Sequence, residues 1–290
     1  MCSTCGCSQD AHARLTKFDD SASSPDSSHA IEHDSLHDHA HEPHHRHAEH
    51  LRHADSHSHP HEDHHQSHQI TRTLRLEQDI LAKNDRIAER NRAWFELHGI
   101  VACNLMSSPG AGKTTLLERT VRDLKNQLAI GVIEGDQETV RDAERIRSCG
   151  CPVVQINTGA GCHLDAEMLN KAIGELAPSP RSLLMIENVG NLVCPALFDL
   201  GERCRVVIMS VTEGEDKPLK YPHMFRASDL LLLSKIDLLP HVPFEIDRCR
   251  DYARRVNPKL KILEVSALQG DGISDWYSWI RERFDQFGVQ

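Results

Sequence analysis

The sequence has no apolar run that approaches the roughly 18 residues of a membrane-spanning helix. Its first residues also lack the basic stretch followed by an apolar stretch that is typical of a secretory signal peptide. We therefore expect a chain that neither crosses a membrane nor is exported. A disulfide framework is not expected at this size and composition, so the ten cysteines are interpreted as metal ligands or small buried residues.

The chain also lacks an excess of basic residues. Residues 1–70 hold 12 acidic and 4 basic side chains, a net charge of −8, so only −2 of the overall −10 belongs to the remainder. A nucleic-acid-binding face needs a basic stripe. The near-neutral remainder therefore argues against a nucleic-acid partner.

Three thiols stand within six positions of the N-terminus, at Cys2, Cys5 and Cys7. Thiolates at this spacing can converge on one soft or borderline metal ion. The alternative is a disordered tail that oxidises readily. We interpret the segment as a metal-binding one.

A histidine-rich tract follows, in which 16 of the 40 residues from His29 to His68 are histidine, interleaved with Asp, Glu and Ser. The tract has almost no apolar residue to bury, so it cannot offset the entropy lost on ordering. Neutral imidazoles bind nickel, zinc or copper, and the tract is therefore predicted to hold several metal ions. A plain solvated linker is the alternative. Residues 1–72 are thus predicted to form a disordered metal-binding tail.

The pattern changes at residue 73, where a predicted amphipathic helix over 73–97 opens a domain that extends to residue 290. Gly99 ends this helix. Its apolar residues, which we expect to pack on the rest of the domain, are Leu74, Ile80, Leu81, Ile87, Trp94 and Phe95.

The domain is organised around a glycine-rich stretch that follows the apolar run Ile100–Met106 and precedes a helical pattern. It reads Ser107-Ser108-Pro109-Gly110-Ala111-Gly112-Lys113-Thr114-Thr115. A strand, a glycine-rich turn and a helix in this order predict a phosphate-binding loop. The first glycine of the general motif is Ser107 here, while the rest of the pattern is intact.

Gly110 and Gly112 allow backbone amides to surround an anionic phosphate at the positive end of the new helix. Lys113 is expected to reach the β- and γ-phosphates, and the Thr114 hydroxyl is expected to ligate Mg²⁺. Nucleotide contacts are predicted along the loop from Ser108, Gly110, Ala111, Gly112, Lys113, Thr114 and Thr115.

Short apolar runs then alternate with helical patterns to the end of the chain. This alternation, with runs rich in Val, Ile and Leu, predicts an α/β fold with a mostly parallel sheet and helices on both faces. The runs are Ile130–Ile133, Val153–Ile156, Leu183–Ile186, Val206–Val211, Leu230–Leu233 and Ile262–Val265, and the helical patterns are 137–148, 163–176, 244–256 and 271–286. Ligands of such sheets bind at the carboxyl ends of the strands.

Carboxylates follow two of these runs. Asp136 and Glu187 are predicted to hold Mg²⁺, directly or through water, and Gly190 is predicted to contact the γ-phosphate. A turn or capping role is the alternative for each.

Ser234-Lys235-Ile236-Asp237 stands where GTPases carry Asn-Lys-x-Asp. A carboxylate at Asp237 can accept from guanine N1–H and N2 amino groups, which adenine does not offer. Lys235 belongs to the same predicted base site, and Ser266 with Ala267 resembles the loop on the other side of the base. Together these residues favour GTP over ATP.

Cys162 and His163 are adjacent, and Cys194 lies four residues after Gly190. If the two loops meet, the three side chains would form a metal site with one tetrahedral position left for water, a partner or a second subunit. The remaining cysteines are more simply explained as core residues.

The N-terminal cysteines, the histidine tract, Ser107–Thr115, Cys162 to Ala166 and Glu187 to Pro195 together closely resemble the hydrogenase nickel-incorporation GTPases of the HypB family, within the phosphate-loop metallochaperone GTPases. The resemblance covers essentially everything from residue 73 onward. In the family the phosphate loop also begins with Ser, whereas Ser234 is less usual.

This resemblance implies a cytoplasmic, slow, Mg²⁺-dependent GTPase that dimerises with nucleotide and binds Ni²⁺ or Zn²⁺ at the subunit interface. It implies nickel delivery to the precursor of the [NiFe]-hydrogenase large subunit, with a small zinc-containing nickel metallochaperone as partner. A urease-type nickel-insertion GTPase is the nearest alternative, but it is expected to carry Cys-Pro-His, and here Ala196 follows Cys194-Pro195. A nickel storage protein is the alternative from another class.

Overall fold

The computed structural model describes residues 13–18, 63–137 and 141–287, and the chain divides into two units, residues 1–19 with 75–290 and residues 20–74. The predicted metal site at Cys2, Cys5 and Cys7 lies outside the described residues, as does the histidine tract up to residue 62. No helix within the described ranges is both long and apolar enough to cross a membrane.

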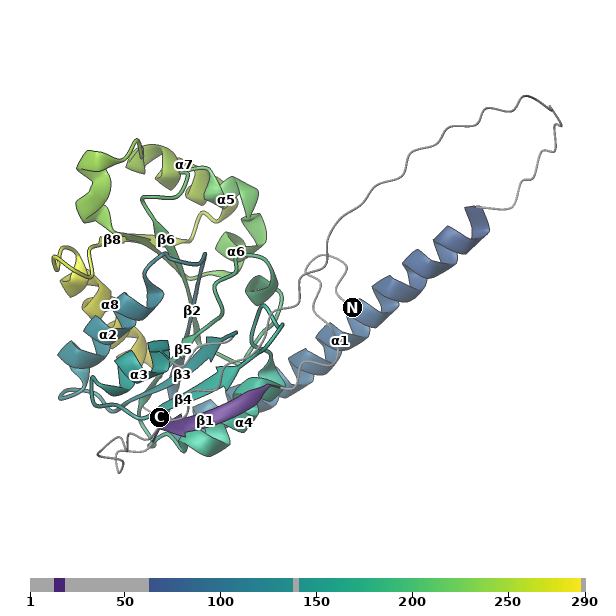
Figure 1. The fold of residues 1–290 in the computed structure, drawn as a ribbon, viewed down its shortest axis with the longest axis horizontal. Coiled ribbons are helices and arrows are strands. Elements are labelled where there is room, and N and C mark those ends of the chain that lie inside the picture. Colours follow the sequence, from purple (N-terminus) through teal and green to yellow (C-terminus); the bar gives the residue numbers. More distant parts are fainter. Residues whose placement is uncertain (1–12, 19–62, 138–140, 288–290) are drawn as a thin grey trace, which may run out of the picture. The chain divides into compact units, whose positions relative to one another are not determined.

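Among the described residues, eight strands form one sheet in the order β1-β4-β3-β5-β2-β6-β7-β8 (Figure 1). Neighbouring strands are parallel, except that β1 runs antiparallel to β4. The predicted mostly parallel sheet is therefore confirmed. The strands are β1 (Arg14–Phe18), β2 (Val101–Ser107), β3 (Ile130–Asp136), β4 (Val153–Asn157), β5 (Leu183–Glu187), β6 (Cys204–Ser210), β7 (Leu230–Ser234) and β8 (Lys261–Val265).

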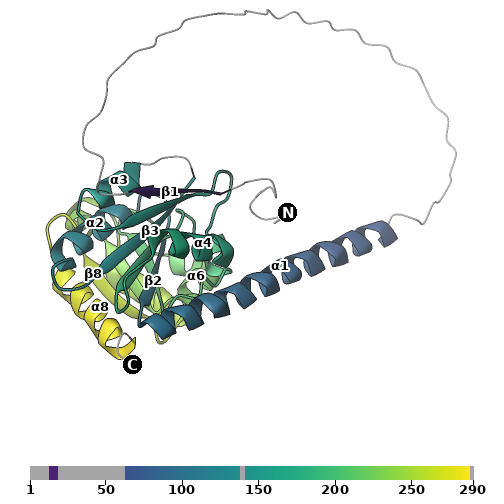
Figure 2. The ribbon, with the colours of Figure 1, turned by 90° about the horizontal axis from the view of Figure 1, so that it is seen from below.

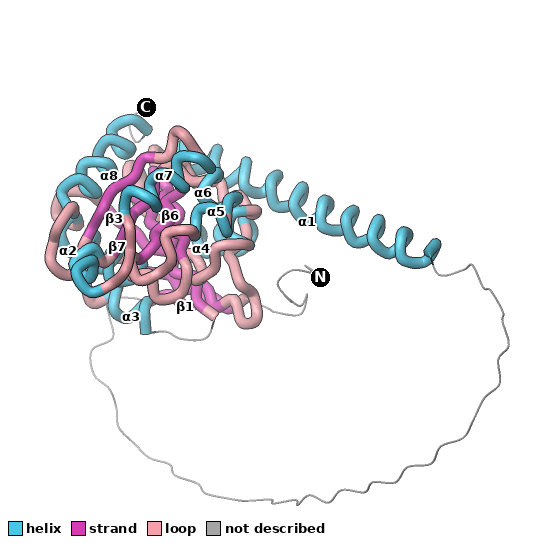
Figure 3. The backbone as a smooth tube through the Cα atoms, turned by 90° about the horizontal axis from the view of Figure 1, so that it is seen from above, coloured by secondary structure: helices cyan, strands magenta, loops and turns pink. Residues whose placement is uncertain are grey.

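Helices flank the sheet on both faces, as the cyan and magenta segments of Figure 3 show. The α-helices are α1 (Asp63–His98), α2 (Lys113–Leu124), α3 (Arg141–Arg147), α4 (Ala166–Leu176), α5 (Lys217–Lys220), α6 (Pro222–Ala227), α7 (Ile246–Val256) and α8 (Ile273–Phe287). In the described part of the chain, the 3-10 helices η1 (Cys194–Ala196) and η2 (Ile236–His241) lie in loops after strands.

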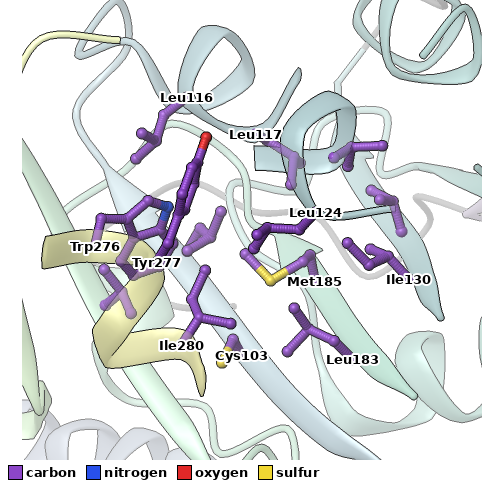
Figure 4. Close-up of a cluster of buried hydrophobic side chains, with 14 of the residues drawn as sticks. Cys103, Leu116, Leu117, Leu124, Ile130, Leu183, Met185, Trp276, Tyr277 and Ile280 are labelled. Carbon is purple, nitrogen blue, oxygen red and sulfur yellow. The ribbon is translucent and has the colours of Figure 1, made fainter. Parts of the chain in front are cut away.

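The apolar core has a separate part on each face. On one face, side chains of α2, α3 and α8 pack on alternate residues of the central strands (Figure 4), with Trp276 and Leu117 fully buried. On the other face, α1 and α4 cover the β3–β5 side through Phe95 and Leu169, and α6 and α7 cover the β6–β7 side. This double covering explains why the strands read as continuous apolar runs.

Helix α1 begins at Asp63 rather than at residue 73, so it includes the last residues of the histidine tract. Its predicted apolar face was wrong in part, because Ile80 is exposed while the side chains of Asn84 and Asn91 are buried. Asn84 accepts from the Ala166 amide at 2.9 Å, and the amide of Asn91 donates to the carbonyl of the same residue at 2.9 Å. Two buried asparagines therefore fix the start of α4, which sequence periodicity did not predict.

Strand β1 lies inside the segment predicted to be a disordered tail, and that prediction was wrong for Arg14–Phe18. The strand pairs with β4 along the edge of the sheet (Figure 2), with Arg14 opposite Asn157 and Phe18 opposite Val153. Leu15 packs on the core of the α1–α4 face. Periodicity did not predict this strand, because a short alternating segment with a single inward apolar side chain does not stand out from the polar residues around it.

Candidate functional site

A cavity of about 460 Å³ lies over the phosphate loop, at the carboxyl ends of β2, β3 and β5. Its walls bring together four segments that are far apart in the sequence. Its lining residues include Pro109 to Thr115, Glu134 to Gln137, Asp142, Arg145, Glu187 to Gly190 and Lys235.

The backbone of the phosphate loop explains its glycines. Gly110 and Gly112 have φ of 73° and 95°, conformations that side-chain-bearing residues rarely adopt. Helix α2 begins at the next residue, so its free amides face the cavity. Lys113 is buried, and its Nζ donates to Ser107 Oγ at 2.9 Å. Burial lowers the pKa of this lysine, which a polyanionic ligand would offset.

Thr114 stands against two carboxylates. Its hydroxyl lies 2.7 Å from Glu187 Oε1 and 3.2 Å from Asp142 Oδ2, and it can donate to one of them at a time. Asp142 was not predicted as a site residue, because it lies inside a polar helical turn rather than at a strand end.

Two buried glutamates lie at the floor of the cavity. Burial, together with the charges of neighbouring carboxylates, raises the pKa of Glu134 to about 9, and burial raises the pKa of Glu187 to about 7. One buried oxygen of each, Oε2, lacks a hydrogen-bond partner. Buried carboxylate oxygens with unused acceptor capacity beside a threonine hydroxyl form the kind of oxygen-rich site that suits Mg²⁺. Glu134 was not predicted as a site residue, since the carboxylate at the very end of the same strand, Asp136, was assigned to the ion instead.

Asp136 lines the same cavity from the end of β3, and its Oδ1 accepts from the Gln137 amide at 2.7 Å. Arg145 also lines the cavity, and it pairs with Asp142 at 3.0 Å and with Glu118 at 2.8 Å. The cavity therefore has a cationic group held close to its carboxylates.

Gly190 lies where the loop after β5 passes the phosphate loop. A Cβ atom at this position would come 3.1 Å from the backbone of Pro109. The close approach places the Gly190 backbone on the wall of the phosphate cavity, as a residue that contacts a terminal phosphate requires.

A second cavity, of about 280 Å³, continues from the first. Its lining contains Lys235, Asp237 and Ala267 among the residues predicted to hold the base. The Nζ of Lys235 donates to the Gly110 carbonyl at 2.7 Å, and the Oγ of Ser234 donates to the Ala111 carbonyl at 2.6 Å. The loop of residues 234–237 is therefore hydrogen-bonded directly to the phosphate loop.

Two predicted nucleotide contacts are not among the residues that line either cavity. Ser266 is buried, and its Oγ accepts from the Gln269 amide at 3.0 Å within its own loop. Ser108 Oγ accepts from Lys217 Nζ at 3.1 Å. The side chains of both residues hold protein loops, which leaves only their backbones for a nucleotide.

Cys162, His163 and Cys194 come together, with their ligand atoms all within 4.8 Å of one another. The two sulfur atoms are 3.2 Å apart, and His163 Nδ1 lies 3.7 Å from the sulfur of Cys162. The His163 ring packs on Phe198, and burial lowers its pKa, which favours the neutral form that binds metals. We refer to these three residues as the triad.

The triad is connected to the nucleotide cavity through Asn188. Its Oδ1 accepts from the Leu164 amide at 3.2 Å, one residue after His163, and Asn188 itself follows Glu187 directly. Gly135 supplies a second connection, because a Cβ there would lie 2.8 Å from the side chain of Leu164. The loop that carries Cys162 and His163 thus packs on β3, which carries Glu134, and on the residue that follows Glu187 at the end of β5.

Asn191 holds the two triad loops to each other. Its Nδ2 donates to the Cys162 carbonyl at 3.2 Å, and its Oδ1 accepts from the Val193 amide at 2.8 Å. The remaining described cysteines are buried, as expected for core residues: Cys103, Cys149, Cys151, Cys204 and Cys249.

Comparisons with known proteins agree on one family. A family model described as the CobW/HypB/UreG nucleotide-binding domain matches residues 101–264. The hydrogenase maturation factor HypB of Azotobacter vinelandii is 58% identical over 213 residues, covering 73% of this chain and 70% of the relative.

Solved structures are similar as well. The crystal structure of HypB from Archaeoglobus fulgidus has a TM-score of 0.66 and 41% identity, over 70% of this chain and 99% of that one. HypB from Helicobacter pylori, crystallised in complex with nickel, has a TM-score of 0.66 and 37% identity, over 72% and 98% of the two chains.

Proposed function

Because this chain belongs to the HypB family of hydrogenase maturation factors, we propose that it is a GTP-hydrolysing nickel metallochaperone whose nucleotide state controls nickel at the triad. The observation that carries the proposal is the contact of Asn188 with the loop of Cys162 and His163, directly beside Glu187. A nucleotide site and a metal site joined by one buried side chain can act on each other.

The phosphate cavity suits a nucleoside triphosphate. The amides at the start of α2 face the phosphates, and the Lys113 ammonium changes partner from Ser107 to the β- and γ-phosphate oxygens. Thr114, Glu187 and Asp142 would hold Mg²⁺, with Asp136 reaching it directly or through water. Bound there, Mg²⁺ neutralises negative charge on the phosphate oxygens.

Guanine fits the second cavity because Asp237 offers a carboxylate to its N1–H and N2 amino groups. The side chain of Lys235, held against Gly110, forms the wall between base and phosphates. Ser234 anchors the phosphate loop instead of contacting the base, so Asp237 supplies the discrimination.

Nickel is the cargo. The triad offers two sulfurs and one imidazole, a set that suits Ni²⁺ or Zn²⁺, and the H. pylori relative was crystallised with nickel. When Gly190 contacts the γ-phosphate, the loop through Asn188, Asn191 and Cys194 is ordered, and hydrolysis releases it. The triad then alternates between holding and releasing the ion.

Membership of the family supports a proposal about the delivery partners. We propose that the chain works in the cytoplasm as a nucleotide-dependent homodimer. It receives or passes nickel through a small zinc-containing metallochaperone and serves the precursor of a hydrogenase large subunit. The exposed apolar side chains of Val193 and Leu197, which flank Cys194, suit an interface at the triad.

Nickel titration in the two nucleotide states tests the proposal. The protein would lack residues 29–62 and carry Ser at positions 2, 5 and 7, so that only the triad binds tightly. We expect nickel affinity to differ about tenfold between GDP and a non-hydrolysable GTP analogue, which corresponds to about 1.4 kcal/mol of coupling. Cys194→Ala should erase the difference. Equal affinities in both states, with no GTP turnover, would instead support a storage protein.

A further inference from the structure

Arg145 brings a positive charge to the phosphate cavity from helix α3. Within the part of the chain that the structure describes, the cationic side chains that line this cavity are Lys113, Arg145 and Lys235. Lys113 belongs to the phosphate loop, and Lys235 is bonded to the Gly110 carbonyl. Arg145 pairs instead with Asp142, one of the groups proposed to hold Mg²⁺. A cation from outside the phosphate loop therefore stands beside the predicted ion site.

The apolar side of α3 sets the direction of Arg145. Ala143 and Ile146 are fully buried in the core that α3 shares with α2, the helix beside it (Figures 1 and 2). Asp142 and Arg145 are three residues apart, so they lie on one face of α3. Both line the phosphate cavity. The sequence of α3 therefore presents a carboxylate and a guanidinium together to the bound phosphates.

Helix α2 holds the guanidinium near the ion site. Nε and Nη2 of Arg145 donate to the two carboxylate oxygens of Glu118 at 3.2 and 2.8 Å, which makes a bidentate pair. Glu118 follows Thr114 by four residues, so the two side chains lie on one face of α2, about 6 Å apart along its axis. Side chains in a helix lean toward its N-terminus. The Glu118 carboxylate is thus directed back toward Thr114 and the cavity.

Asp142 connects the guanidinium to the ion site. Its Oδ2 lies 3.2 Å from the Thr114 hydroxyl, and its Oδ1 accepts from Arg145 Nη1 at 3.0 Å. A carboxylate that binds a divalent cation attracts a second cation less strongly. The Arg145 side chain is 44% exposed, and ion pairs of exposed groups contribute little to stability. Nη1 can therefore change partner while Nε and Nη2 stay on Glu118.

We propose that Arg145 is a catalytic residue for GTP hydrolysis, whose guanidinium contacts the γ-phosphate and stabilises the negative charge of the transition state. The inference rests on the proposed function for the identity of the substrate. Nη1 already lies against a carboxylate of the phosphate cavity, so the side chain needs no large movement. A positioned cation of this kind accelerates phosphoryl transfer by electrostatic stabilisation.

Hydrolysis forms one bond and breaks one. The oxygen of a water molecule bonds to the γ-phosphorus. The bond from that phosphorus to the bridging oxygen breaks, and its electron pair stays on GDP. Both protons of the water end on the phosphate, so GTP and water give GDP and dihydrogen phosphate with no change in total charge. Arg145 neither gives nor takes a proton, because a guanidinium stays protonated in proteins.

Turnover and binding in the full-length protein test the assignment. Arg145→Ala should lower the single-turnover rate of GTP hydrolysis with Mg²⁺ by about 100-fold, while its affinity for GDP stays within about threefold of wild type. Aluminium fluoride with GDP mimics the transferring phosphoryl group. It should tighten GDP binding about tenfold or more in wild type and should not do so in the variant. If Arg145→Ala does not bind GDP, Arg145→Gln replaces it, since its amide can still donate to Glu118.

Two matched variants separate catalysis from helix packing. Glu118→Gln weakens the bidentate pair between α2 and α3 but keeps the guanidinium, so turnover should stay within about threefold of wild type. Arg141→Ala removes an exposed arginine of the same helix that does not line the cavity, and should keep full turnover. A loss in Glu118→Gln as large as in Arg145→Ala would show that the arginine only joins the two helices, and would overturn the catalytic role.

The same measurements separate this assignment from the proposed function. Equal turnover in wild type and Arg145→Ala would overturn the role of Arg145, while GTP hydrolysis by the chain would stand. A wild-type response to aluminium fluoride in the variant would also overturn contact with the γ-phosphate. If the wild-type protein neither hydrolyses GTP nor binds GDP more tightly with aluminium fluoride, the proposed GTPase function and the role of Arg145 are overturned together.

Discussion

Glu134 and Glu187 are register partners on the neighbouring parallel strands β3 and β5, both almost completely buried beneath the phosphate loop. Two adjacent carboxyl groups without full hydrogen-bond partners resist ionisation together. A divalent ion held by Glu187 would relieve this conflict, so the pair would link ion binding to proton release.

The stability of the metal-free protein should fall as pH rises from about 5 to about 9. Both pKa values are raised above their usual 4.5, so the native state binds more protons than the unfolded state over this range. Glu134→Gln should remove much of the slope and stabilise the protein at pH 8 by an amount on the order of 2 kcal/mol. Urea unfolding in EDTA measures this, with the exposed Glu89→Gln as control. If the slope of unfolding free energy against pH is unchanged in this variant, the raised pKa of the buried Glu134 carboxyl group is contradicted.

Lys113→Ala should lower GTP turnover by at least two orders of magnitude, because the buried ammonium is the group placed to contact the β- and γ-phosphates. Phosphate release under saturating Mg²⁺ measures the effect. Lys171→Ala, an exposed lysine on α4, serves as the matched control and should retain full turnover. Normal turnover in the Lys113 variant would remove the phosphate-loop assignment.

The variants Asp237→Asn and Ser234→Ala should distinguish the side chain that selects the nucleotide base from the one that holds the phosphate loop. The first should reduce the preference for GDP over ADP by tenfold or more, since the carboxylate is the acceptor specific to guanine. The second loses one hydrogen bond to the Ala111 carbonyl and should weaken both nucleotides about equally, by roughly threefold to tenfold. Competition binding with GDP and ADP gives both ratios. A changed ratio in the Ser234 variant would show that this side chain reads the base.

Asn188→Ala should reduce the coupling between nucleotide and nickel while leaving the triad in place. The variant loses the acceptor of the Leu164 amide but none of the three metal ligands. Nickel affinity in GDP and in a non-hydrolysable GTP analogue should converge to within about threefold. Asn170→Ala, an exposed asparagine bonded to Asn91, is the control and should keep the difference. Undiminished coupling in the Asn188 variant would point to the contact of Gly135 with Leu164 as the connection.

Deleting residues 29–62 should lower nickel stoichiometry by several ions and leave GTP turnover unchanged. The deletion keeps β1 and helix α1, which a deletion of residues 1–70 would disturb. In wild-type protein the same ions should be lost as pH falls below about 6.5, because protonated imidazoles do not bind metals. Metal analysis after gel filtration counts them. An equal count in both proteins would exclude metal storage in the tract.

The sequence predicted the elements whose signals are local. The parallel strands each overlap a predicted apolar run, and the phosphate loop follows from consecutive residues of fixed chemistry. The triad could be proposed because Cys162 and His163 are adjacent and Cys194 lies near Gly190.

The misses share one physical cause: they depend on contacts between distant segments. Asn84 and Asn91 are polar in sequence, yet each is buried because a backbone group of another element supplies its partner. Asp142 reaches Thr114 only because α3 packs beside α2. Strand β1 needs the open edge of β4 to form at all.

That edge has a consequence for handling the protein. β4 ends the parallel part of the sheet, and β1 occupies its outer row of backbone donors and acceptors. A chain shortened past Phe18 would present this row to solvent, and exposed strand edges pair with the edges of other molecules. Protein that lacks the tail should therefore self-associate through β4. Dimerisation measured in such protein would result from the missing strand and not from nucleotide binding.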